Sequence, residues 1–154
     1  MRKLFTLALC ALSMSCIAQT KKMDLSRKEI GPLRPALYKQ EINLETGDTI
    51  RYIIMLFQNV RYSSITDTKS IMFLNPERDS SNVLKFIEDL KAAQLESDKG
   101  VDMTWEHPMY NIRVKEKDKA IYLIDPTGTT GYTYLTMRQS DMLLDWFASL
   151  GFKH

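Results

Sequence analysis

A strand that runs directly into an amphipathic helix is the feature that most constrains this fold. The stretch is YTYLTMRQSDMLLDWFASLG, residues 132–151. Thr136 predicts the start of the helix, since its hydroxyl can accept the backbone N–H of Gln139 while the Gln139 side chain reaches back. After this capping box apolar residues recur at helical spacing, and Gly151 predicts the end of the helix. The apolar residues are Met142, Leu143, Trp146, Phe147 and Leu150.

The same arrangement occurs 60 residues earlier in the chain. Residues 83–90, VLKFIEDL, match residues 143–150, LLDWFASL, in the positions of their apolar side chains. A short apolar run at residues 71–74 precedes the earlier helix, just as residues 132–135 precede the later one. We therefore expect two copies of one strand–helix unit.

Alternating apolar and polar residues predict further strands ahead of each helix. The first helix is expected to begin between Pro76 and Ser81 and to end near Leu95. The resulting order, βββα-βββα, predicts an α+β fold: a two-layer antiparallel sheet with its helices on one face, whose halves suggest a pseudo-twofold repeat. The expected strands cover residues 38–44, 49–58, 69–74, 110–115, 120–124 and the stretch that starts at Tyr132.

The beginning of the chain predicts a secretory signal peptide at residues 1–18. A positively charged start, MRK, precedes a short apolar segment at residues 4–12, and small residues stand before a cut at Gln19. We therefore expect export across the inner membrane, to the periplasm or out of the cell. The alternative is a lipid anchor on Cys16 as the mature N-terminus.

Removal of the signal peptide changes the composition of the chain. Both cysteines, Cys10 and Cys16, lie within it, so the mature chain would have no disulfide, no thiol nucleophile and no cysteine ligand. The full chain has 21 Lys and Arg against 19 Asp and Glu, and loss of Arg2 and Lys3 leaves these charges in balance. A balanced charge argues against nucleic acid as a partner. We also expect no transmembrane segment in the mature chain.

The length of 154 residues leaves room for one domain with a substantial core. Residues 19–35 are polar and mixed in charge and contain two prolines. We therefore expect them to form an arm that is disordered or loosely docked. The single α+β domain is then expected to cover residues 36–154.

The densest group of potential ligands lies around His107, in SDKGVDMTWEHP. The acids do not have the spacing of a calcium loop, and zinc would need further ligands from elsewhere. We therefore expect no metal and no other cofactor, and a solvated loop in which Trp105 is free to contact a ligand. The alternative is a small periplasmic hydrolase or metal-dependent protein that uses His107 with Asp102 or Glu106.

The strand at residues 49–58 carries the main functional expectation. Its residues 53–57 are apolar on both faces, whereas the two helices can cover only one face of a sheet. We expect Ile54 and Leu56, or their neighbours on the other face, to form an apolar strip on the side without helices.

Something must close this strip, because large exposed apolar patches are rare on monomers. The candidates are the arm at residues 19–35, the loop at residues 59–68, a second copy of the chain, or a partner. No pattern typical of a catalytic site accompanies the strip. We therefore expect an exported, non-catalytic module that binds a protein or a cell-envelope component through its sheet, with Ile54, Leu56 and Trp105 as candidate contacts.

Overall fold

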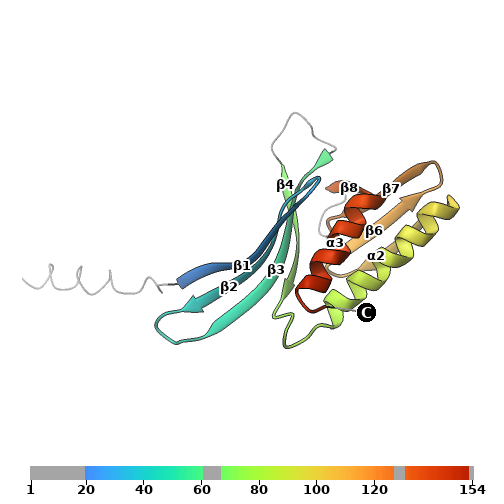
Figure 1. The fold of residues 1–154 in the computed structure, drawn as a ribbon. Helices are drawn as coiled ribbons and strands as arrows, with labels where there is room; N and C mark the ends of the chain where they lie inside the picture. The colour runs from blue at the N-terminus through green and yellow to red at the C-terminus, as the bar shows by residue number, and fades with distance from the viewer. Residues whose placement is uncertain (1–19, 61–66, 127–130, 153–154) are drawn as a thin grey trace, which may run out of the picture.

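The computed structural model describes residues 20–60, 67–126 and 131–152 (Figure 1). Within these ranges the order of elements is ββββα-ββββα, so each half has one strand more than the sequence pattern predicts. The elements are β1 (Thr20–Ile30), β2 (Leu33–Asn43), β3 (Thr49–Gln58), β4 (Thr68–Leu74), α2 (Ser81–Lys99), β5 (Met103–His107), β6 (Tyr110–Lys115), β7 (Asp118–Ile124), β8 (Tyr132–Thr136) and α3 (Met137–Ser149).

The strands form two antiparallel sheets rather than one. Sheet A has the order β1-β2-β3-β4, and sheet B has the order β5-β6-β7-β8. Both helices lie along one face of sheet B, and α3 also contacts β1 of sheet A (Figure 1). The prediction of an α+β fold with antiparallel strands and a repeated strand–helix unit is confirmed. In Figure 1 the β2–β3 hairpin extends well beyond the helices, so part of sheet A is not covered by them.

One hydrophobic core joins the two sheets and the two helices. Phe86 of α2 lies at its centre. The Phe86 ring centroid is 5.5 Å from that of Phe73 in β4, 4.9 Å from Tyr110 in β6 and 5.7 Å from Phe147 in α3. These tilted and edge-on contacts are the arrangements that aromatic pairs prefer. We call the face of each sheet that packs into this core its inner face.

The two helices begin in different ways. At α3 the predicted capping box is present: Thr136 Oγ1 accepts the Gln139 N–H at 3.3 Å, and Gln139 Oε1 accepts the Thr136 N–H at 2.9 Å. At α2 the N-cap residue Ser80 makes no side-chain capping bond, and Asp79 accepts the Ser81 N–H at 3.0 Å instead. The α2 helix therefore starts at Ser81, the last position of the expected range. Side chains accept fewer of its first backbone N–H groups than they do at α3.

The expectation of a disordered or loosely docked arm at residues 19–35 is wrong from Thr20 onward. Thr20–Ile30 form β1, which pairs antiparallel with β2, and residues 33–35 already belong to β2. Oppositely charged side chains lie across from one another, with Lys22 3.1 Å from Glu41. Cross-strand charge pairs of this kind favour pairing. A polar run that resembles a disordered arm is therefore an edge strand of sheet A.

The turn between β1 and β2 lies against the start of α3. Gly31 has a positive φ of 53°, and a Cβ on it would stand only 2.1 Å from Gln139 Nε2. A side chain at this position would push aside the end of the Gln139 side chain, which forms one bond of the capping box, and the positive φ also favours glycine. The sheets also meet at Asn59, whose Oδ1 accepts the backbone N–H of Tyr132 at 3.3 Å.

The second correction concerns the stretch that contains Trp105 and His107. It was expected to be a loop, but residues 103–107 form β5, the edge strand of sheet B next to β6. Trp105 lies opposite Ile112, is half-buried and packs against the core. The alternation of Met103, Trp105 and His107 with polar neighbours was a strand signal that the surrounding acidic residues obscured.

Several expectations concern residues outside the described ranges. They are the signal peptide at residues 1–18, the cut before Gln19, the alternative anchor at Cys16 and residues 61–66 of the expected loop. Among the helices that the structure describes, none has the length and apolar character needed to span a bilayer.

Candidate interaction surface

The face of sheet A that points away from the helices is the candidate site. In β3 the residues Ile53, Met55 and Phe57 are buried in the core, whereas Ile54 and Leu56 are only half-buried on the opposite side. We call this opposite side the outer face of sheet A. Its apolar side chains come from three neighbouring strands: Leu37, Ile50, Tyr52, Ile54, Leu56, Met72 and Leu74.

The apolar residues of the outer face form a continuous row across the strands. Ile54 pairs with Leu37 on one side and with Met72 on the other. Leu37 is only 6% exposed although its pairing with Ile54 places it on the outer side, so neighbouring side chains of that face cover it. Exposure rises toward β4, to 41% at Met72 and 55% at Leu74. An apolar patch that is open at one edge is typical of a contact surface.

Charged and polar groups border this patch toward β1. The Tyr52 hydroxyl donates to Glu41 at 2.6 Å, and Lys39 lies 3.4 Å from Asp24. Burial and the hydrogen bond to Glu41 raise the pKa of Tyr52 to about 12. The hydrogen bonds from Tyr52 and Lys22 lower the pKa of Glu41 below its ordinary value. An apolar centre with a polar rim is the composition found at protein interfaces.

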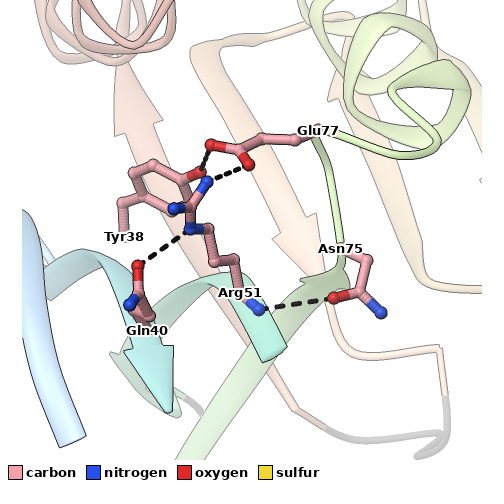
Figure 2. Close-up of polar contacts among 5 residues, drawn as sticks. All are labelled: Tyr38, Gln40, Arg51, Asn75 and Glu77. Atoms are coloured by element: carbon pink, nitrogen blue, oxygen red, sulfur yellow. Dashed lines mark hydrogen bonds and ion pairs between the residues drawn. The ribbon is translucent and has the colours of Figure 1, made fainter. Parts of the chain in front are cut away.

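A second polar cluster lies on the inner face of sheet A, between β2, β3 and the connection from β4 to α2 (Figure 2). The Tyr38 hydroxyl donates to Glu77 at 2.5 Å, and Arg51 forms an ion pair with the other oxygen of the same carboxylate. Arg51 also donates to Gln40 at 2.9 Å, and its backbone N–H donates to Asn75 at 3.3 Å. The cluster therefore fastens the β4–α2 connection, which carries Glu77, to β2 and β3.

The electrostatics of this cluster follow from its hydrogen bonds. Burial and the bond to Glu77 raise the pKa of Tyr38 to about 12. Hydrogen bonds from Tyr38 and Arg51 lower the pKa of Glu77 below its ordinary value. The carboxylate is thus held in its charged form by two donors, which suits a structural anchor better than a proton-transfer group.

The structure does not bring the three residues of the alternative enzymatic site together. His107 stacks on Tyr110 with 4.4 Å between ring centroids, and its Nδ1 accepts the Met109 N–H at 3.2 Å. Asp102 pairs with Arg113 at 3.2 Å. Glu106 precedes His107 on β5, so the two side chains point to opposite faces of sheet B. In the described part of the chain, no group of three His, Cys, Asp or Glu is placed to hold a metal ion.

A polar triad that the sequence pattern does not indicate lies beneath His107; two of its members, Tyr110 and Asp89, are buried, and Lys85 is half exposed. Tyr110 donates to Asp89 at 2.9 Å, and Lys85 of α2 lies 2.8 Å from the other Asp89 oxygen. Burial and this hydrogen bond raise the pKa of Tyr110 above its ordinary range. Asp89 is almost fully buried, and helical spacing alone does not reveal that. The triad satisfies a charge inside the core and joins α2 to β6, so its role is structural.

A hollow of about 850 Å³ lies where the two sheets meet. Arg34, Tyr134 and Gln139 contribute to its walls. Gln139 is already engaged in the capping box, and Arg34 Nε donates to the Gly31 carbonyl at 3.0 Å. These polar groups therefore support the turn and the helix around the hollow.

Comparisons with known proteins find no family model, no curated protein and no solved structure that matches this chain. The function of the outer face must therefore be inferred from its own chemistry.

Proposed function

We propose that this chain is an exported, non-catalytic module that binds a protein or a cell-envelope component through the outer face of sheet A. The observation that supports the proposal most directly is the apolar row of Leu37, Ile54 and Met72, which lies on the side of the sheet without helices. Leu37 is covered, but the row becomes exposed toward β4. Burial of this surface against a partner would contribute about 25 cal/mol for each Å² of apolar area removed from water.

A polar rim favours a specific contact over general adhesion. The charged side chains near β1, including Glu41 and Lys39, are engaged with neighbours in the same sheet. They keep one border of the patch hydrated and orient any partner that covers the apolar centre.

A binding experiment with paired variants tests this proposal. Ile54→Ser combined with Leu56→Ser removes apolar contact from two alternate positions of β3. We expect the double variant to remain folded by circular dichroism and to lose capture of its partner from cross-linked envelope extract. Tyr132→Ser combined with Tyr134→Ser is the matched control, because these residues also alternate along one strand but lie on the outward side of sheet B. Equal capture by the wild type and the Ile54/Leu56 variant would refute the proposal.

Export is a separate part of the proposal, supported by the pattern of residues 1–18. We expect the exported protein to begin at Gln19, which intact-mass measurement of the exported fraction would establish. An N-terminus at a lipid-modified Cys16 would support the anchored alternative. Retention of residues 1–18 would contradict cleavage.

A further inference from the structure

The edge of sheet A at β4 has backbone groups that point away from the sheet. Asn75 N donates to the Arg51 carbonyl at 2.6 Å, and Asn59 N donates to the Asp67 carbonyl at 2.8 Å. These two bonds fix the phase of the ladder between β3 and β4, because hydrogen-bonded and non-hydrogen-bonded pairs alternate along an antiparallel pair. Ile71 and Phe73 therefore bond to β3, while the N–H and C=O groups of Ser70, Met72 and Leu74 point to the open edge.

This edge is also accessible. Ser70, Met72 and Leu74 are all exposed residues, and β3 is the only strand that pairs with β4 in the described ranges. A strand edge with unpaired backbone groups and exposed apolar side chains favours addition of another strand.

The opposite edge of sheet A is protected against such pairing, whereas the β4 edge is not. More than half of the residues of β1 are charged, and its register shifts between Asp24 and Ser26 and again between Lys28 and Ile30. Charged residues and irregular register are common devices that prevent edge pairing. The β4 strand has a regular register and carries a single charged residue, Lys69, on the inner side.

We propose that β4 pairs with β4 of a second copy of this chain, antiparallel and about a twofold axis at Met72. In this register Met72 of one copy lies opposite Met72 of the other, and Ser70 lies opposite Leu74. Each of these pairs exchanges both of its N–H···O bonds, so every outward-pointing group of the three residues is used. The outer faces of the two copies join into one larger apolar surface.

A second copy fits this edge because the strand is self-complementary about that axis. The residues brought together on the outer side are Met72 and Leu74 with one serine, so no charges oppose one another. Lys69 points to the other side and lies 3.5 Å from Asp67 of its own chain. The inference deepens the proposed function because it names a second copy of the chain as one partner. It rests on the proposed function in one respect: the pairing enlarges the outer face that the function uses.

Charge substitution at Met72 tests the pairing, because the twofold axis places residue 72 of one copy next to residue 72 of the other. We expect protein purified after expression of the full chain to have twice the monomer mass in sedimentation equilibrium. Met72→Lys and Met72→Glu should each lose the dimer, since like charges would face one another. An equimolar mixture of these two variants should regain the doubled mass. Met23→Lys is the matched control: Met23 is 39% exposed on the opposite edge strand, close to the 41% of Met72, and its variant should remain dimeric.

Each outcome supports or overturns the pairing of β4 with a second copy of the chain. A monomeric wild type across the concentration series overturns the second copy, and a folded Met72→Lys variant that stays dimeric places the interface elsewhere. Failure of the mixture to recover the doubled mass, after both variants lose it, overturns the twofold register. The oligomeric state reports on this inference, whereas partner capture by the Ile54/Leu56 variant reports on the proposed function, so the two can fail separately.

Discussion

Sheets A and B have the same number of strands and the same hairpin order, yet they differ in what they place on the face away from the helices. The outer face of sheet A has an aliphatic centre around Ile54. The corresponding side of sheet B is aromatic and charged: the Tyr122 ring lies 5.8 Å from Tyr132 and 6.3 Å from Tyr134, and Lys115 lies 4.6 Å above it. The repeat therefore conserves the pattern that builds the core and leaves the second face of each sheet free to differ.

The two helices are also alike in burying an aromatic residue at one position of the repeat and different in what that residue contacts. Phe86 and Trp146 occupy equivalent positions of the repeat, 60 residues apart. Both are buried, but Phe86 contacts aromatic rings from both sheets' strands and from α3, whereas Trp146 lies at the border with β1 and donates to Ser26 at 3.0 Å. The first helix is thus central to both sheets, while the second seals one side of sheet A.

The largest expected effect tests this difference between the helices. Phe86→Ala and Trp146→Ala should each lower the free energy of unfolding by about 3–5 kcal/mol, because both leave a large cavity in the core. We expect the Phe86 variant to lie at the upper end, since its ring packs against three elements. Urea denaturation measures both changes. A midpoint unchanged by either substitution would show that its helix is not docked as described.

A smaller effect is expected at the helix starts. Thr136→Ala removes the hydroxyl that accepts the Gln139 N–H, the side-chain half of the capping box, and should cost about 1 kcal/mol of stability. Ser80→Ala at the start of α2 should change stability by less than about 0.5 kcal/mol, because Ser80 makes no side-chain capping bond. Thr136→Ser retains the hydroxyl and serves as the control. Equal losses from the two alanine variants would remove the distinction between the helix starts.

The smallest expected effect is the change in stability with pH at the polar cluster of sheet A, for which a polar pair in sheet B provides a comparison. The folded pKa of Glu77 lies below its ordinary value of 4.5, so its contribution to stability is present above pH 4.5 and is lost as the pH falls through the folded pKa. Glu77→Gln should therefore destabilise the protein at neutral pH by less than the loss at Thr136, with the difference from wild type shrinking in acid. Thermal melts from pH 7 to acid measure this difference.

A local pair in sheet B provides the comparison for Glu77. The Tyr122 hydroxyl donates to Asp118, only 4 residues away, whereas Tyr38 and Glu77 are 39 residues apart. Asp118→Asn should therefore have less effect on the melting temperature than Glu77→Gln, because it releases no connection between distant elements. A larger effect of Asp118→Asn would contradict the role of Glu77 as an anchor.

The sequence was informative where one element carries its own signal. The capping box at Thr136 and the apolar positions of α2 between Val83 and Leu90 were predicted correctly, because periodicity and capping depend on neighbouring residues. The two-sided apolar pattern of residues 53–57 also located a central strand, with β3 between β2 and β4. Placement of Ile54 and Leu56 on the side without helices follows from the same alternation.

Features that depend on distant partners could not be predicted in this way. The stretch that forms β1 looks polar and unstructured until the charges of Glu41 and Lys39 are placed opposite it. Likewise, the residues next to Asp89 in the sequence do not show that it is buried, because its partner Tyr110 lies 21 residues away. The division of the strands into two sheets is also a tertiary property, since every hairpin is compatible with either arrangement.

The hydrogen bond between Trp146 and Ser26 has a consequence for the order of events during synthesis. The two residues are 120 positions apart, so β1 is complete long before its indole partner exists. The meander of sheet A can form early, because each hairpin is local, but its contact with α3 must wait until α3 has been synthesised. Contacts with such large sequence separation slow folding. The fluorescence of this indole would therefore report the final closure step, and a truncated chain that lacks α3 would expose the border of β1 that Trp146 otherwise seals.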